Sequence, residues 1–279
     1  MMSSRSWARP AGDLAAAAWL LGVVAWSLYP VVWVVVSSLK PQAEQFAVPP
    51  AWWPRQPSLD NYRHFLSSHE VLRVIANTIV VTTGGVAVAL FLGVPMAYAL
   101  SRFRLRSGET VSFLILLARM TPPVVMILPF FVGARWIGLA GTRTVLVLAG
   151  AFLALPFAVW MMRGFFAEIP VELEEAAMVD GATRSRAALR VVVPLTAPGL
   201  AATAVLCAIL VWNEFLFPLV LGGAEARTLP VLVSMYVTEK AVDWGTMSAA
   251  GVVTALPLVV FGLLIQKYLV QGLTAGSIK

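Results

Sequence analysis

Six long apolar runs constrain this chain more than any other feature of its sequence. They cover residues 14–36, 74–100, 111–133, 145–162, 199–221 and 248–270. An α-helix needs about 20 residues to cross a hydrocarbon core about 30 Å thick, and each run has close to that length or more. Hydrophobic residues make up 59% of the chain and charged residues 12%. The sequence therefore predicts an integral membrane protein.

The runs predict helices and not the strands of a membrane barrel. Lipid offers no water to unpaired backbone groups, and the runs lack the alternating pattern and short turns of barrel strands. The first run is longer than the apolar core of a signal peptide and carries Trp19, Trp26 and Trp33, which favours an uncleaved span. We therefore expect one all-α transmembrane domain, residues 1–279, with six membrane-spanning helices.

The orientation is indicated by a compact basic cluster, Arg102, Arg104 and Arg106, between the second and third runs. Basic residues in short loops favour the cytoplasmic side of a membrane. Because an even number of spans returns the chain to its starting side, both termini are then cytoplasmic, as is the charged segment 163–198. The loops 37–73 and 222–247 face outward in this arrangement.

The two outer loops have different patterns. Prolines from Pro41 to Pro57 predict an extended first half for the loop 37–73. Residues 58–66 then predict a short amphipathic helix along the outer surface, with a simple linker as the alternative. The loop 222–247 is longer than a turn requires, and Tyr236 and Trp244 are candidate contacts for an external protein. A merely solvated loop is the alternative there.

Charged residues return between the fourth and fifth runs. Pro170 suits the first turn of a helix, where its missing N–H is no loss. Glu172, Glu174 and Glu175 oppose the positive end of the helix dipole. Gly181 supplies the left-handed conformation that ends a helix at the preceding residue. The segment therefore predicts a short helix between Pro170 and Gly181.

A second short helix follows the first. Thr183 is a suitable N-cap for a helix over residues 184–193, which Pro194 ends. In the first helix, Ala176 and Ala177 keep the surface flat enough for a partner to approach closely. The pair of helices thus predicts a docking unit, and an ordinary amphipathic cytoplasmic helix is the alternative.

The spacing in this segment resembles the EAA motif of the membrane subunits of bacterial ABC importers. The matching residues are Glu175, Ala176, Ala177, Gly181, Val191, Val193 and Pro194, where the two valines replace the usual Ile and Leu. The resemblance covers residues 14–279 and is closest to the second permease subunit of carbohydrate importers of the maltose-type class. Further matching stretches are residues 60–62, 97–103, 122–123, 212–215 and 272–276.

This resemblance implies a type I ABC importer permease fold with a cytoplasmic coupling-helix loop. In that family the residues from Glu175 to Gly181 sit in a cleft of the ATPase subunit and transmit its closure to the spans. The implied docking residues are Glu174, Glu175, Ala176, Ala177, Asp180, Gly181, Arg184 and Pro194. The implied partners are a second, different permease subunit, two ATP-binding subunits and an extracytoplasmic solute-binding protein. The implied cargo is a sugar or related polar solute, and the implied location is the bacterial cytoplasmic membrane.

Polar residues inside the apolar runs are candidates for the solute path. Trp212, Asn213, Glu214 and Phe215 place an amide and a carboxyl beside two aromatic rings, and Arg119 lies in the third run. Charged groups at membrane depth face the bundle interior or a water-filled cavity, and sugars stack on rings while bonding to amides and carboxylates. A structural role is the alternative. At about 1.5 Å per residue, Glu214 lies roughly 22 Å and Arg119 roughly 12 Å from the cytoplasmic ends of their spans, so we expect no direct ion pair.

Other functions fit the sequence less well. A membrane-embedded enzyme needs a nucleophile, a base or a metal cluster at membrane depth. A proton- or ion-coupled carrier or channel needs several ionisable residues there, and Arg119 and Glu214 are the main candidates. The sequence has no P-loop, so we expect ATP and Mg²⁺ on a partner subunit and no catalysis or cofactor on this chain. His64 and His69 share one polar loop without a metal-ligand pattern, and the scattered basic residues argue against nucleic acid.

Overall fold

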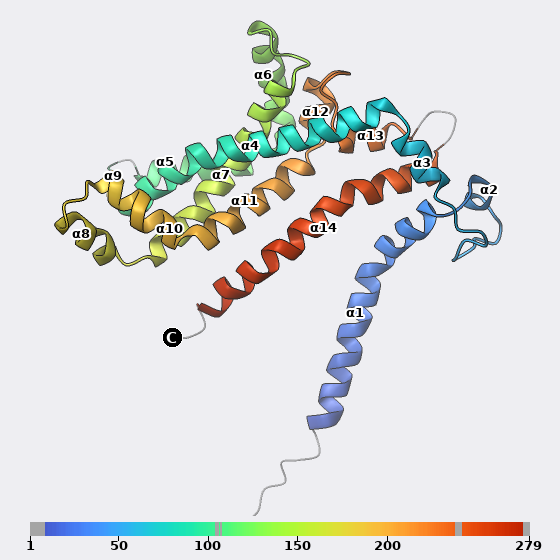
Figure 1. The fold of residues 1–279 in the computed structure, drawn as a ribbon, viewed down its shortest axis with the longest axis horizontal. Helices are drawn as coiled ribbons and strands as arrows, with labels where there is room; N and C mark the ends of the chain where they lie inside the picture. Colours follow the sequence, from blue (N-terminus) through green and yellow to red (C-terminus); the bar gives the residue numbers. More distant parts are fainter. Residues whose placement is uncertain (1–8, 104–105, 107, 238–241, 276–279) are drawn as a thin grey trace, which may run out of the picture. The chain divides into compact units, whose positions relative to one another are not determined.

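The computed structural model of the protein describes residues 9–103, 106, 108–237 and 242–275, which are mostly helical (Figure 1). The β-structure of this described part is one isolated bridge between Val237 and Val242. Contacts between Cα atoms divide the chain into two compact units. The first contains Met1–Ser68 and Met235–Val253, and the second contains His69–Ser234 and Thr254–Lys279. The all-α prediction is confirmed for the described residues.

Four helices are long and apolar enough to cross a membrane over most of their length. They are α1 (Arg9–Ser38), α4 (His69–Arg102), α7 (Arg143–Glu168) and α14 (Trp244–Ala275). Two bent pairs pass the same test together: α5 (Gly108–Met120) with α6 (Pro123–Trp136), and Arg184–Leu195 with α11 (Ala197–Trp212). The described residues therefore hold four to six spans, and the predicted six corresponds to one crossing for each bent pair.

The third predicted span, residues 111–133, is not one straight helix. The chain bends by 96° between α5 and α6. Pro122 has ψ 131°, an extended conformation. A proline disfavours the helical conformation of the residue before it, and here two prolines follow each other. The prediction of a continuous helix is therefore wrong at Thr121 and Pro122, and α6 starts at Pro123.

The fifth predicted span, residues 199–221, is also interrupted. The helix α11 ends at Trp212, and α12 (Leu216–Leu221) starts as a separate helix. The Glu214 carboxylate accepts hydrogen bonds from the backbone N–H groups of Leu216 at 2.9 Å and Phe217 at 3.1 Å. A carboxylate that binds the first N–H groups of a helix stabilises a new helix start at that point.

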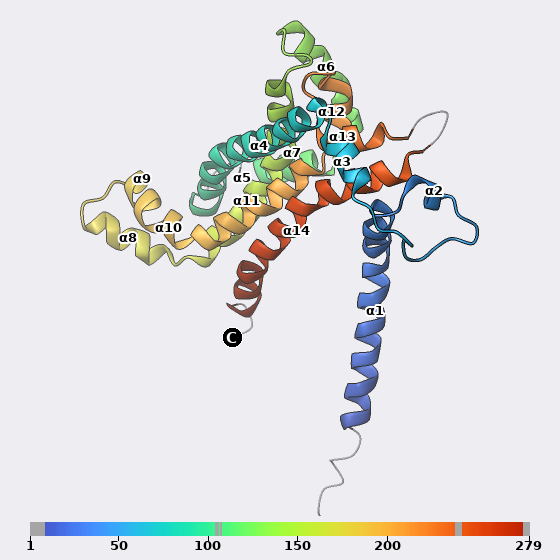
Figure 2. The same ribbon diagram turned by 45° about the vertical axis from the view of Figure 1, so that its right-hand side comes forward.

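In the second unit, α4 packs against α7 and α11 to form the core, and these helices lie side by side in both views (Figures 1 and 2). Small residues allow close packing. A Cβ atom built on Gly85 would lie 3.3 Å from backbone atoms of Gly150 and Ala151, and one on Gly199 would lie 2.4 Å from the Phe165 ring. Membrane helices associate through such small residues, because lipid removes the hydrophobic drive between helices.

The first unit contains α1, the one-turn helix α2 (Gln42–Gln45), α3 (Asp60–Leu66) and the start of α14. The predicted helix within residues 58–66 is confirmed as α3. The side-chain amide of Asn61 donates to the carbonyls of Ser38 at 2.8 Å and Lys40 at 2.9 Å, which fixes α3 to the end of α1. The helix α2 corrects the prediction of a fully extended first half of this loop.

Candidate functional site: a short helix pair and a polar cavity

The predicted helix before Gly181 is present as α8 (Val171–Val179). Gly181 has φ +90°, and its N–H donates to the Met178 carbonyl at 3.1 Å. The Ala182 N–H donates to the Ala177 carbonyl at 3.0 Å. These two bonds form a Schellman motif, in which a left-handed residue satisfies the last carbonyls of a helix. The prediction of a glycine-terminated helix is confirmed.

The second predicted helix is longer than expected and contains a π turn. Thr183 caps it, because its hydroxyl accepts the Arg186 N–H at 3.4 Å. The run consists of α9 (Arg184–Ala187), the π-helix η1 (Ala188–Val192) and α10 (Val193–Leu195). The prediction that Pro194 ends the helix is therefore wrong.

The π turn explains why the helix passes the proline. The Val193 N–H donates to the Ala188 carbonyl, five residues back, directly before Pro194. A π turn inserts one residue into the helix and changes which carbonyl faces the next N–H position. Proline has no N–H to donate, so Pro194 cannot make the next helical hydrogen bond. After the register change the helix still continues through Pro194 and ends at Leu195.

Glu174 faces the interior of the chain and not the surface of α8. The residue is 2% exposed. Its carboxylate accepts a hydrogen bond from the Tyr98 hydroxyl and one from Arg102 Nε at 3.1 Å. Arg102 Nη2 also donates to the Ile169 carbonyl at 2.8 Å. Glu174 was grouped with the docking residues from its place in the sequence, but its own carboxylate is bound by the last turns of α4.

An aromatic cluster supports the same junction. The Tyr98 ring meets the rings of Phe103 and Phe166 edge to face, with centroids 6.2 Å and 5.8 Å away. The Arg184 guanidinium lies over the Phe103 ring at 5.2 Å. Arg184, another predicted docking residue, therefore contacts the end of α4 through a cation–π interaction.

The other predicted docking residues lie at the surface. Glu175, Ala176, Asp180, Gly181 and Pro194 are exposed, and Ala177 is half-buried. The most exposed large apolar residues of this helix pair are Val179, which is 87% exposed, and Leu189, which is 69% exposed. Sequence reasoning missed both. They are added to the candidate docking residues of this helix pair.

Arg119 and Glu214 line one cavity of about 300 Å³ within the second unit. Thr121 adds a hydroxyl, and the Arg119 guanidinium lies 4.9 Å from the centroid of the Phe157 ring. The other lining residues are Ala118, Pro123, Met126, Phe152, Leu153, Pro156 and Leu210. Among the described residues, the ion pairs within 4 Å do not include one between Arg119 and Glu214. The cavity thus combines two unlike charges with aromatic and aliphatic walls.

The neighbours of Glu214 do not line this cavity. Trp212 is buried, its Nε1 donates to the Thr254 carbonyl at 3.0 Å, and its ring meets Phe261 edge to face. Asn213 is exposed and donates to the Ile209 carbonyl at 2.8 Å, and Phe215 is also exposed. The predicted group of four residues is therefore divided, and Glu214 alone lies at the cavity with Arg119.

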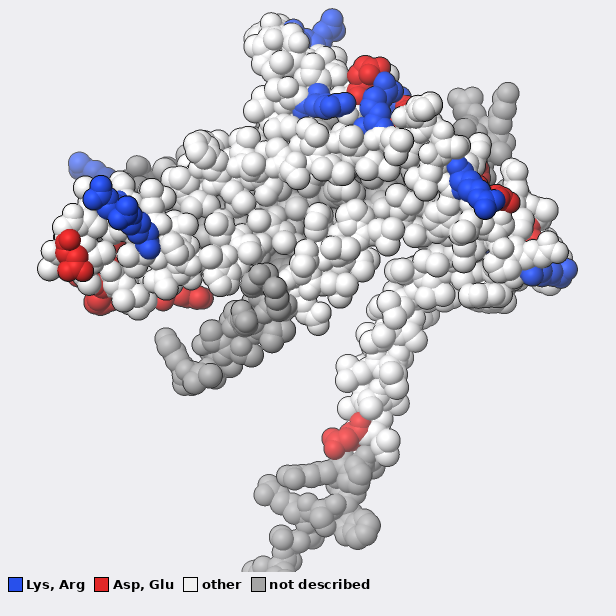
Figure 3. All heavy atoms as spheres, in the orientation of Figure 1, with Lys and Arg blue, Asp and Glu red and all other residues white. Residues whose placement is uncertain are grey.

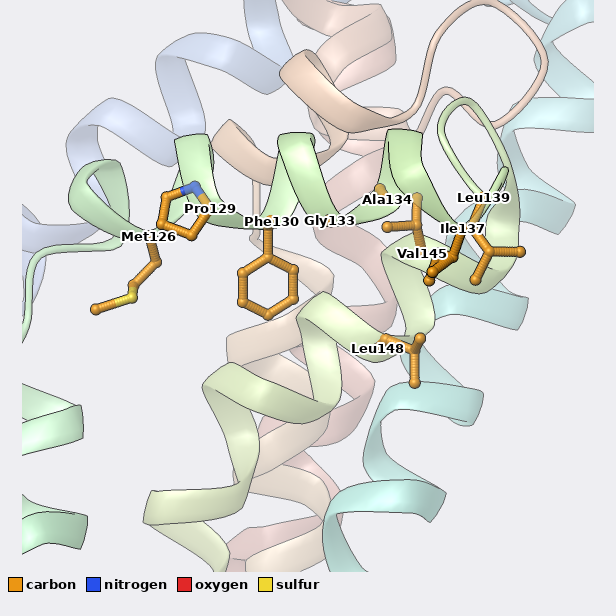
Figure 4. Close-up of a pocket in the computed structure, with 9 residues that line it drawn as sticks. All are labelled: Met126, Pro129, Phe130, Gly133, Ala134, Ile137, Leu139, Val145 and Leu148. Atoms are coloured by element: carbon orange, nitrogen blue, oxygen red, sulfur yellow. The ribbon is translucent and has the colours of Figure 1, made fainter.

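A second cavity of about 350 Å³ lies between α6 and α7 (Figure 4). Its walls are apolar, and the Phe130 ring points into the space between the two helices (Figure 4). The lining residues are Met126, Pro129, Phe130, Gly133, Ala134, Ile137, Leu139, Val145 and Leu148. This cavity offers no side-chain hydrogen bonds to a polar solute.

The candidate contacts for an external protein lie in the first unit. Tyr236 is half-buried, with its ring 6.3 Å from that of Phe65. Trp244 starts α14 and is 47% exposed. Residues 238–241 of the predicted loop 222–247 lie outside the described residues.

Comparisons with known proteins decide the family. The family described as "Binding-protein-dependent transport system inner membrane component" matches residues 85–275. The chain belongs to this family. It is 37% identical to the sulfoquinovosyl glycerol transport system permease protein SmoH of Agrobacterium fabrum, over 90% of this chain and 89% of that protein. It is 34% identical to the trehalose transport system permease protein SugB of Mycobacterium tuberculosis, over 92% of this chain and 94% of that protein.

Solved structures agree with this assignment. A chain of a bacterial ABC transporter that imports the acidic polysaccharide alginate matches with a TM-score of 0.77 and 28% identity, over 96% of this chain and 99% of that chain. A chain of the MetNI methionine ABC transporter shares the fold, with a TM-score of 0.60 and 20% identity over 70% of this chain and 93% of that one. This family member is therefore a transmembrane permease subunit of an ABC importer, a family that is normally non-catalytic.

Proposed function

We propose that this permease forms half of the translocation path for a sugar or related polar solute and docks an ATPase through the helix pair 171–195. The observation that carries the proposal is the surface of that pair. An exposed carboxylate, two alanines and the left-handed glycine share it with the apolar side chains of Val179 and Leu189. A cleft on an ATPase would cover these apolar groups and meet Glu175 and Asp180 with basic residues.

The sugar class rests on the relatives and on the cavity. The relatives named above transport sulfoquinovosyl glycerol and trehalose by their names. In this chain, the cavity with Arg119, Thr121 and Glu214 offers both hydrogen-bond donors and acceptors, and Phe152 offers a ring face. Hydroxyl groups need donors and acceptors, and the C–H faces of a sugar stack on rings. The cavity therefore suits a polyhydroxyl solute better than the apolar one beside α6.

The partners follow from the same reading. A second, different permease completes the path, two ATP-binding subunits carry ATP and Mg²⁺, and an extracytoplasmic binding protein delivers the solute. Tyr236 and Trp244 are proposed contacts for that binding protein. The helix pair 171–195 and both termini are then on the cytoplasmic side of the cytoplasmic membrane.

The experiment that tests the function is purification of the tagged chain from its native host, followed by reconstitution into vesicles. An ATP-binding subunit is expected to copurify, and vesicles loaded with ATP and Mg²⁺ should take up a radiolabelled sugar only when the binding protein is added. A chain that purifies without any ATP-binding subunit would contradict the proposal.

A further inference from the structure

The inner end of α4 is fixed to the helix pair by buried bonds. Arg102 and Glu174 have side chains that are 6% and 3% exposed, and their ion pair is joined by the Tyr98 hydroxyl. Arg102 also holds the Ile169 carbonyl, directly before α8 begins. Because removing one partner leaves a buried charge uncompensated, this junction resists separation. The start of α8 therefore moves with the last turns of α4.

The outer end of the same helix is fixed to the segment 225–229. The fully buried side-chain amide of Asn77 donates to the carbonyls of Glu225 at 2.8 Å and Arg227 at 2.9 Å. The Thr78 hydroxyl accepts the Leu229 N–H at 2.9 Å.

Two ion pairs close the same junction. Arg227 pairs with Glu70, and Arg73 pairs with Glu225 at 2.7 Å. All four bonded side chains of α4 lie in its first three turns, so the segment 225–229 is attached to that end of the helix.

Between these ends α4 is one continuous helix. Its 34 residues extend about 50 Å at about 1.5 Å per residue. Figure 3 shows charged side chains gathered over α8 and α9 and again near α12 and α13, with uncharged surface on α4 between them. Pro95 removes one internal hydrogen bond, but α7 supports that region, since a Cβ atom built on Gly93 would meet Ala158 at 3.2 Å.

The covalent route between the same two segments is less stiff. From the helix pair it runs through α11, which is entered by a 74° bend after Leu195 and left by the break at Asn213. A displacement is lost where backbone angles can change, so it passes more completely along a continuous, packed helix.

We propose that α4 is the element that connects the outer segment 225–229 to the ATPase-docking helix pair, with Asn77 and Arg102 as its two positioning residues. The proposal rests on the proposed function. When a solute-loaded binding protein shifts the segment 225–229, the bonds to Asn77 and Thr78 move the outer end of α4. The bonds of Tyr98 and Arg102 then move Glu174 and α8 against the ATPase.

The test uses the complete importer in nanodiscs and the ratio of ATP hydrolysis with and without solute-loaded binding protein. Asn77→Leu removes the outer amide and Arg102→Met removes the inner guanidinium, while both keep side-chain size. Each change should lower the stimulation ratio at least about fivefold, the lower range of coupling between sites. The stimulation ratio of the double variant should be no lower than that of the more impaired single variant. Both changes interrupt the same connection, so their effects should not add.

Two matched changes serve as controls. Thr83→Val removes a hydroxyl of α4 that bonds within its own helix, and Arg106→Met removes an exposed arginine close to Arg102. Both should keep the wild-type ratio. If Asn77→Leu or Arg102→Met fails to assemble, Thr78→Val and Tyr98→Phe replace them, and each removes one hydroxyl.

Each outcome decides the matter. An unchanged ratio in the assembled inner and outer variants, or a double variant in which the two losses multiply, would overturn the role of α4. A wild-type complex without an ATPase partner or without stimulation would instead overturn the proposed function.

Discussion

Replacing Gly181 with valine should uncouple ATP hydrolysis from transport without preventing membrane insertion. Gly181 has φ +90°, and no heavy atom outside its own neighbours lies within 4 Å of a Cβ atom built there. The new side chain therefore meets open space, and the cost comes from the backbone alone. A left-handed conformation costs an L-residue about 1–2 kcal/mol, with β-branched residues at the upper end.

The strain acts on the end of α8. If the chain relieves it by leaving the left-handed conformation, the two Schellman bonds to Met178 and Ala177 are lost, at a net cost of about 1 kcal/mol each. Either way, the native helix pair loses about 2 kcal/mol, which lowers its population roughly thirtyfold relative to altered forms. Docking to the ATPase should weaken by up to the same factor, because only the native form of the helix pair binds.

The assay is solute uptake per ATP hydrolysed in reconstituted vesicles. Gly181→Asn should retain most coupling, because asparagine tolerates the left-handed region, and Gly181→Ala should fall between asparagine and valine. Gly164→Val is the matched control, since Gly164 lies in α7 with equally open space and no positive φ. Wild-type uptake per ATP by Gly181→Val would refute the role of the glycine-terminated helix in coupling.

Three further predictions address other parts of the chain. Glu174→Gln should lower the free energy of unfolding by about 3–5 kcal/mol, because the buried Arg102 loses its counter-charge. Glu175→Gln should change the free energy of unfolding little, because Glu175 is exposed. Equal melting temperatures of the two variants in detergent would contradict this. Arg119→Ala and Glu214→Gln should each raise the KM of uptake about tenfold through lost hydrogen bonds at the cavity. Asn213→Ala should leave the KM unchanged. If all three variants keep the wild-type KM, the cavity is not part of the solute path. In a Cys207→Ala background, an impermeant maleimide should label Ser68→Cys in intact cells but Glu109→Cys only after permeabilisation, and the reverse pattern would invert the topology.

Local chemistry made much of the helix pair predictable. The left-handed glycine and the Thr183 cap act within a few residues of their own position, so the sequence contains the whole interaction. The failure at Pro194 is of the same local kind, but it depended on a π turn that no residue pattern marks. Apolar length likewise predicted the four long helices, but not the break before Pro123 or the end of α11 at Trp212.

Contacts between distant residues were not predictable. Glu174 and Glu175 are neighbours with the same side chain, but Glu174 is buried and Glu175 is exposed. The burial of Glu174 depends on its ion pair with Arg102, which lies 72 residues earlier in the chain. The joint cavity of Arg119 and Glu214 was hidden for another reason. Positions along straight spans placed these residues at different depths, and the 96° bend of the third span breaks that assumption.

The two prolines at this bend change the chemistry of the backbone as well as its direction. In an α-helix the carbonyls of Ala118 and Arg119 would accept N–H groups from residues 122 and 123, and prolines have none to give. Both residues line the cavity with Glu214. At these two positions the bend removes no N–H donor, because proline has none, and it leaves the two carbonyls without a helical partner. Carbonyls left in this way suit the O–H donors of a polyhydroxyl solute, the class proposed for this permease.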